Sequence, residues 1–201
     1  MTTTKTSGST LTRTFFLAFL FSLLFSPYLS AQLNSKDIKR FTETVDKAYG
    51  INDMLVNGYP YIIPNQMING HPYLYQNSWI KATIYIDGNK FSGKPVKYDL
   101  QKDDLVLKAD FGNGRFNLVQ LNKMLVDSFK IGNNLFVQST HYSLNIEEPT
   151  YYEELYRNGV LFLRSFDKKF VSNYTELSPR GKFSDLLESR YILKNDKLHK
   201  I

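Results

Sequence analysis

The sequence contains no cysteine, only one tryptophan, and no block of like charges. Without cysteine the chain forms no disulfide and has no thiolate for catalysis or for zinc binding. Its 25 basic and 19 acidic residues give a formal net charge of +6, spread along the chain. A nucleic-acid-binding protein would instead carry a stripe of arginine and lysine with aromatic residues between them. We therefore expect no nucleic-acid partner.

Aromatic residues are what the chain has in abundance, with 14 tyrosines and 15 phenylalanines. Together with a hydrophobic fraction of 42%, they make the composition too apolar for a disordered chain. A length of 201 residues is enough for one well-buried core. The composition therefore predicts a folded, tyrosine-rich domain.

Residues 1–31 have the pattern of a secretory signal peptide. A basic start precedes a largely apolar run at 15–25, and Ala31 is a small residue directly before Gln32. Signal peptides have about 7–15 apolar residues, whereas a membrane anchor needs about 20. We expect cleavage between Ala31 and Gln32 and export to the periplasm or cell surface, without stable membrane insertion. An uncleaved membrane anchor is the alternative.

Two short helices are predicted near the two ends of the mature chain. In the N-terminal helical segment, residues 32–57, one apolar stripe recurs at helical spacing: Ile38, Phe41, Val45 and Tyr49. The second helix is predicted over 183–188, after a proline and a glycine.

Short strands separated by Asn, Asp and Gly fill most of residues 58–201. They are predicted over 79–86, 96–100, 105–108, 115–119, 126–131, 135–137, 152–156, 160–164, 190–194 and 198–201. Asn158-Gly159 is the strongest hairpin signal. Most gaps are shorter than the dozen or so residues that a parallel crossover requires. We predict a mainly β domain: an antiparallel meander curled into a barrel-like or sandwich form, because a flat sheet of this size would expose its edges.

Several of these motifs resemble those of an uncharacterised family of exported β-rich proteins from Gram-negative bacteria. The similar segments are 70–74 with Trp79, 85–88, 96–100, 104–107, Phe129 with Phe136, 151–159 and 191–195. The resemblance covers roughly residues 58 to 201, and its motifs are structural. It implies an exported β-rich fold of the cell envelope and no known activity.

No constellation of catalytic or metal-binding residues stands out. The histidines His71, His141 and His199 lack the spacing of a zinc motif, and neither a nucleophile elbow nor a phosphate-binding loop occurs. Six carboxylates could supply an acid–base pair for hydrolysis, but most fall in predicted turns or on alternating strand faces: Asp87, Asp99, Asp103, Asp104, Glu153 and Glu154. We expect no catalytic site, metal or cofactor. A secreted hydrolase of polysaccharide or peptide is the alternative.

A cluster of aromatic residues within a proline-rich segment is the best candidate for a binding surface. Its members are Tyr59, Tyr61, Tyr73, Tyr75 and Trp79. If exposed, these rings would suit contact with a sugar or a partner protein; if buried, they are ordinary sheet core. We predict a non-enzymatic domain that binds an envelope component or partner protein. A structural module of an envelope assembly is a further alternative.

Overall fold

The computed structural model describes residues 36, 40, 52–144 and 148–201. The chain divides into two units, Met1–Thr42 and Glu43–Ile201, and the fold described below is that of the second. The signal peptide, its cleavage site at Ala31 and Gln32, and the helical stripe of 38–49 lie outside the described residues. No helix in the described part of the chain has the length and apolar character needed to span a membrane.

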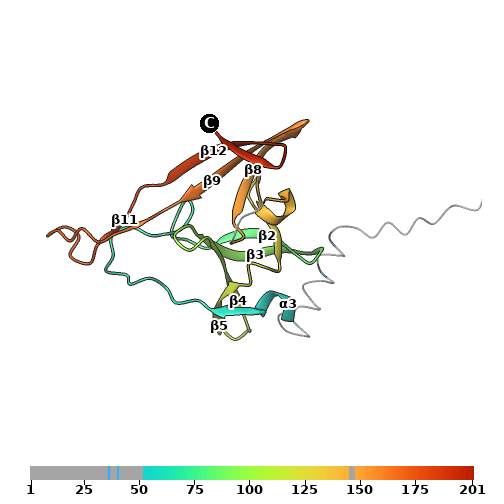
Figure 1. The fold of residues 1–201 in the computed structure, drawn as a ribbon. Helices are drawn as coiled ribbons and strands as arrows, with labels where there is room; N and C mark the ends of the chain where they lie inside the picture. The colour runs from blue at the N-terminus through green and yellow to red at the C-terminus, as the bar shows by residue number, and fades with distance from the viewer. Residues whose placement is uncertain (1–35, 37–39, 41–51, 145–147) are drawn as a thin grey trace, which may run out of the picture. The chain divides into compact units, whose positions relative to one another are not determined.

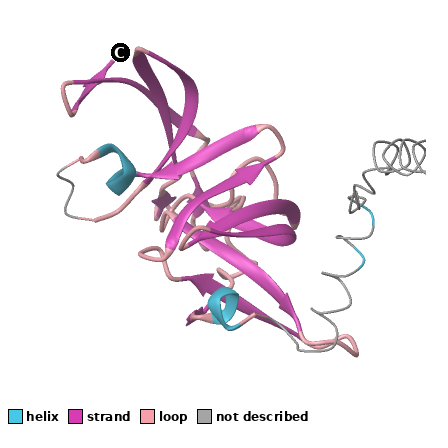
Figure 2. Ribbon diagram, turned by 90° about the vertical axis from the view of Figure 1, so that its right-hand side faces the viewer, coloured by secondary structure: helices cyan, strands magenta, loops and turns pink. Residues whose placement is uncertain are grey.

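Strands dominate the described part of the chain (Figures 1 and 2). Eleven of them form one sheet in the order β1-β5-β4-β3-β2-β6-β7-β8-β9-β12-β13. Their bounds are β1 Gly58–Pro60, β2 Ile80–Ile86, β3 Asn89–Asp99, β4 Asp104–Asp110, β5 Phe116–Leu121, β6 Val126–Ile131, β7 Asn134–Gln138, β8 Tyr151–Asn158, β9 Val160–Asp167, β12 Leu187–Lys194 and β13 Lys197–Lys200. Strands β10 Phe170–Val171 and β11 Lys182–Phe183 pair separately. Every ladder between these strands is antiparallel.

The predicted mainly β character and its hairpins are confirmed. Gly88 turns the chain from β2 to β3 with φ of 74°, and Gly159 turns it from β8 to β9 with φ of 69°. These are left-handed conformations that glycine adopts without steric cost. The C-terminal strand pairs into the sheet, with Lys197 opposite Lys194.

The sheet is not a simple meander, because β1 pairs with β5, β2 with β6 and β9 with β12. Strands β2 to β5 follow one another across the sheet, but β6 then returns to pair with β2. Ile84 consequently has Phe91 of β3 on one side and Phe129 of β6 on the other. This return places the apolar strand β2 in the interior of the sheet.

The expected closure into a barrel is wrong. Among the described strands β1 pairs only with β5 and β13 only with β12, so the sheet keeps two free edges. Closure requires outer strands of matching tilt and stagger, whereas these two have only three and four residues. Short outer strands limit the number of unpaired backbone groups without closing the sheet. A sandwich or curled form stays a prediction.

The helix predicted over 183–188 is also wrong, because strands β11 and β12 occupy both of its ends. The amide of Phe183 donates to the carbonyl of Asn69 at 2.9 Å, and that of Ser184 donates to the carbonyl of Lys169 at 2.8 Å. Leu187 lies opposite Asp167 of β9. An isolated helix this short is marginally stable in water. Strand pairing with neighbouring segments is therefore more stable here than the helix.

One short helix, α3 Asp53–Val56, lies within the segment 32–57 that is predicted to be helical. The side chain of Asn52 caps it by accepting a hydrogen bond from the amide of Met54 at 2.9 Å. Leu55 is buried in the main core. The helix therefore covers part of the sheet next to β5, with which it makes contact.

Four aromatic side chains form the centre of the main core. The rings of Phe129 and Phe136 stack at 4.8 Å between centroids, and Tyr98 and Tyr151 meet Phe129 edge-on at 5.1 and 5.0 Å. Such arrangements add to the stabilisation from buried area. A second cluster on the other face of β4 contains Val106, and this face carries the candidate site.

Candidate functional site

The segment 61–79 connects β1 to β2, and its side chains Tyr61, Tyr73 and Trp79 pack in the cluster that contains Val106. Its backbone is fixed to the strands: the amide of Tyr61 donates to Leu118 at 2.9 Å, and that of Leu74 donates to Tyr98 at 2.9 Å. The carbonyl of Pro72 accepts from Leu100 at 3.0 Å. These bonds satisfy backbone groups that would otherwise be buried without partners. The connection is therefore held against the sheet at several points.

A buried carboxylate, Asp99, anchors the side chains of this segment. The hydroxyl of Tyr61 donates to one carboxylate oxygen at 2.6 Å, and the hydroxyl of Tyr73 lies 3.3 Å from that of Tyr61. The other oxygen accepts from the amides of Gln101 at 3.0 Å and Lys102 at 3.3 Å. Burial, followed by the bond to Asp99, raises the pKa of Tyr61 far above its ordinary value. Tyr61 therefore stays protonated and serves as a donor.

The five predicted binding residues fall into two groups. Tyr61 and Tyr73 are buried against Val106, and Trp79 is partly buried beside them. Tyr59 is 65% exposed and Tyr75 is 50% exposed. The aromatic cluster is thus partly core and partly surface.

Two hollows adjoin at His71, and we refer to them together as the His71 groove. They share Gly70, His71 and Phe183. The first, of about 360 Å³, is lined further by Ile63, Pro64, Asn65, Gln66, Pro72, Tyr73, Asn77 and Lys97. The second, of about 220 Å³, is lined further by Tyr75, Lys168, Ser184, Asp185 and Leu186. The groove thus brings the aromatic segment together with β3 and with the strands around β11.

Two lysines in the groove have neutral hydrogen-bond partners. The amine of Lys97 donates to the side-chain oxygen of Asn77 at 2.7 Å and lies 4.3 Å from the ring centroid of Tyr73. The amine of Lys168 donates to the carbonyl of His71 at 3.0 Å. Burial lowers the pKa of both lysines. The groove is therefore lined by two lysine amines that are each partly removed from water.

His71 stands between these cations. Its Nδ1 is buried and has no hydrogen-bond partner in the described structure. Burial, with the charge of Lys168 as the next cause, lowers the pKa of His71. The sequence predicts only that His71 is a turn residue. The alternation of polar and apolar residues along β3 does not indicate that Lys97 lines the same groove. Both residues are brought together by the path of the connection 61–79.

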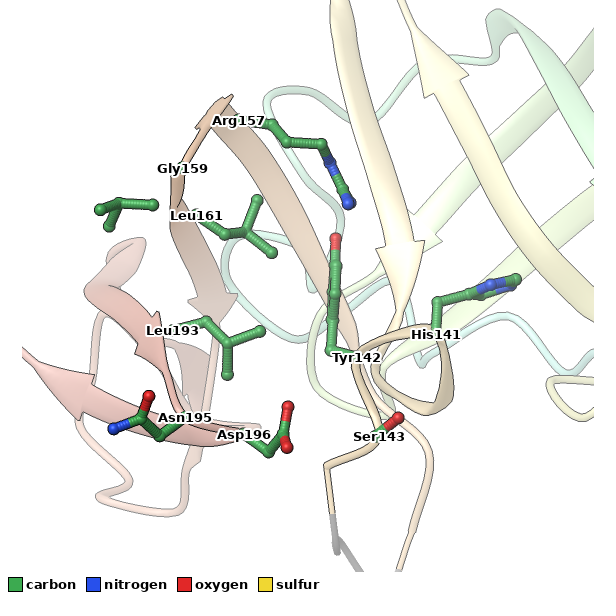
Figure 3. A pocket seen from close by; sticks show the side chains of 10 residues that line it. His141, Tyr142, Ser143, Arg157, Gly159, Leu161, Leu193, Asn195 and Asp196 are labelled. Atoms are coloured by element: carbon green, nitrogen blue, oxygen red, sulfur yellow. The ribbon is translucent and has the colours of Figure 1, made fainter.

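A third hollow, of about 430 Å³, lies between the 3₁₀ helix η1 Ser139–Tyr142 and the tips of two hairpins (Figure 3). Leu161 and Leu193 supply apolar walls. Arg157 is bound by Glu154 through two hydrogen bonds of 2.7 Å each. Its charge is therefore already neutralised, unlike those of the lysines in the His71 groove.

The six candidate carboxylates are not gathered into a catalytic pair lining any of these hollows. Asp99 and Asp104 are buried, and Glu153 is buried against Arg164 at 2.6 Å. Asp103 accepts a hydrogen bond from Tyr98, and Asp87 occupies the turn after β2. Within the described ranges no three His, Cys, Asp or Glu residues form a group that could hold a metal ion.

A pH dependence of stability is expected from Asp104. Burial raises the pKa of its carboxyl from 3.8 to about 6, although Lys123 opposes the shift. The unfolded chain therefore loses this proton first as the pH rises, so the free energy of unfolding falls between the two values. The decrease is at most about 3 kcal/mol, since one pKa unit is worth about 1.4 kcal/mol. In Asp104→Asn this decrease disappears.

Urea unfolding of both proteins at several values of pH measures this difference. Asp104→Asn is expected to gain stability relative to the parent as the pH increases from about 4 to about 6. Parallel profiles of the two proteins would show that Asp104 does not titrate in this range.

The described residues of the His71 groove are mostly polar and aromatic, with a single carboxylate. Asp185 is the one carboxylate that lines it among the described residues. Hydrolysis of a glycosidic bond requires two carboxyl groups that flank it.

No protein-family model, curated protein or solved structure matches this chain.

Proposed function

We propose that this chain is an exported, non-enzymatic β domain that binds a component of the bacterial cell envelope or a partner protein through the His71 groove. The observation that carries the proposal is that a connection fixed to the sheet presents polar and aromatic side chains around adjoining hollows. Binding residues commonly lie on connections that a rigid scaffold holds in place.

The support of the groove is preorganised. Within the segment, the hydroxyl of Tyr61 donates to the buried carboxylate of Asp99. The carbonyl of Pro72 accepts a hydrogen bond from the turn after β3. A ligand therefore meets side chains that are already ordered, which reduces the entropy lost on binding. We further infer that the sheet curls, because one core cluster contains residues from β2 through β8.

Export is the part of the proposal that rests on the leader, residues 1–31. It places the mature chain in the periplasm or at the cell surface. A hydrolase is less favoured, because Asp185 is the sole carboxylate among the described residues of the groove.

The function can be tested by capture from a solubilised Gram-negative envelope fraction onto immobilised protein lacking residues 1–31. Tyr75→Ala removes an exposed ring that lines the groove and is expected to reduce the captured component about tenfold, a loss of about 1.4 kcal/mol in binding. The captured component is identified by mass spectrometry and its affinity is then measured with purified material.

Tyr59→Ala is the matched control, since Tyr59 is also an exposed tyrosine but lines neither hollow of the groove. It should leave capture unchanged. Equal capture by the parent and both variants would refute binding through the groove.

A further inference from the structure

We propose that the ligand of the His71 groove is an acidic sugar, whose carboxylate or phosphate group binds beside His71 and is neutralised by Lys97 and Lys168. This inference rests on the proposed function and specifies the chemistry of its ligand. It follows from the two lysines of the groove, which bond to neutral oxygens, and from the amide and aromatic side chains of the remaining lining.

Lys97 differs from Lys123 and Arg164, two partly buried cations outside the groove. Lys123 is paired with Asp103 at 3.1 Å, and Arg164 is paired with Glu153 at 2.6 Å. Lys97 has no carboxylate partner among the described residues, and its amine is bonded to a neutral amide. Removing a cation from water without an opposite charge is unfavourable. An anion bound here would supply the missing charge.

Lys168 extends the positive region across the boundary of the two hollows, where His71 lies. The charges of Lys168 and Lys97 both act on His71 and lower its pKa. Asp185 offsets part of the charge of Lys168. Nδ1 of His71 is buried and has no partner in the described structure, so the two lysine amines are the charged groups that an anion in the groove would meet. A carboxylate or phosphate oxygen would form charge-assisted hydrogen bonds with these groups, which are stronger than neutral ones.

The remaining lining fits the ring and hydroxyl groups of a sugar. Asn65 and Gln66 offer amide groups for hydrogen bonds, whereas the hydroxyl of Ser184 already bonds to Asp185 and Lys169. Tyr75 presents a half-exposed ring against which a pyranose can pack. Phe183 supplies an apolar surface common to both hollows. An inorganic anion such as phosphate would make no contact with these amide, aromatic and apolar side chains.

The inference is tested by NMR titration of the protein lacking residues 1–31 with D-glucuronate, glucose 6-phosphate, neutral glucose and inorganic phosphate. Both acidic sugars are expected to bind at least tenfold more tightly than glucose, and to shift the imidazole resonances of His71. Phosphate alone should bind more weakly than glucose 6-phosphate. The two acidic sugars distinguish a carboxylate site from a phosphate site.

Lys97→Met and Lys168→Met should each weaken binding of the acidic sugars about tenfold while leaving glucose binding unchanged. Methionine keeps an apolar side chain over Tyr73 at position 97, and thermal unfolding verifies that each variant is folded. Lys130→Met, at an exposed lysine of β6 that lines neither hollow, is the control and should bind like the parent.

Equal affinities for glucose and the acidic sugars would overturn the requirement for an anion and leave the proposed function standing. Absence of any sugar-induced shift, with envelope capture still dependent on Tyr75, would overturn the sugar class alone. If capture is also independent of Tyr75, the proposed function fails as well.

Discussion

Replacing Phe129 with alanine is expected to lower the free energy of unfolding by about 4 kcal/mol. The side chain is fully buried, and its ring contacts those of Phe136, Tyr98 and Tyr151. Alanine removes these contacts and leaves a cavity that strands on both sides cannot collapse to fill. Because a domain is typically stabilised by about 5–15 kcal/mol, this is a large fraction of the total.

Phe116→Ala is the control for this measurement. Phe116 lies on β5 but is 51% exposed, so its removal is expected to change stability by less than about 1 kcal/mol. Urea unfolding followed by far-UV circular dichroism measures both variants. A loss below about 1 kcal/mol for Phe129→Ala would show that the aromatic cluster is not the centre of the core.

Replacing Asp99 with alanine is expected to cost about 3 kcal/mol, because it removes the common acceptor of three donors. The hydroxyl of Tyr61 and the amides of Gln101 and Lys102 would lose their partner. A buried donor left without an acceptor costs about 1–3 kcal/mol. The same substitution should loosen the segment 61–79 and weaken ligand binding in the His71 groove.

A double-mutant cycle isolates the bond between Asp99 and Tyr61. We expect a coupling energy of about 1.5–3 kcal/mol between Asp99→Ala and Tyr61→Phe, the range of hydrogen bonds to charged groups. Tyr59→Phe, at an exposed tyrosine of the neighbouring strand β1, should show no coupling with Asp99→Ala. Equal coupling for both tyrosines would contradict the network.

The strands themselves could be predicted from local sequence. Alternation over 80–86 and 126–131 and the turn at Gly159 specify strand faces and a hairpin without reference to the rest of the chain. Which strands become neighbours is not a local property. Nothing in the alternation of β6 indicates that it returns to β2, because any apolar strand face could fill that place.

The failure of the predicted helix at 183–188 has the same origin. Its apolar residues are compatible with a helical face, but Phe183 pairs with Phe170 and Leu187 pairs with Asp167. Those partners lie on segments that only the tertiary fold brings near. A local propensity of this size is easily overridden by such pairing.

The candidate site was partly visible in the sequence. The proline-rich segment with Tyr73 and Tyr75 does border the His71 groove. Lys97 and Lys168 could not be assigned to it, because they lie on β3 and after β9, far along the chain from that segment. Surface lysines are also common for reasons of solubility alone, so their chemical setting becomes distinctive only in the folded chain.

The two outer strands bear on how copies of this chain behave at high concentration. β1 contains Pro60, which has no amide hydrogen to donate, and β13 carries exposed lysines at both of its ends. A proline and repeated like charges make a poor template for another molecule's backbone. The outer strands of the described sheet are therefore poorly suited to extension by the backbone of another molecule, even at high protein concentration.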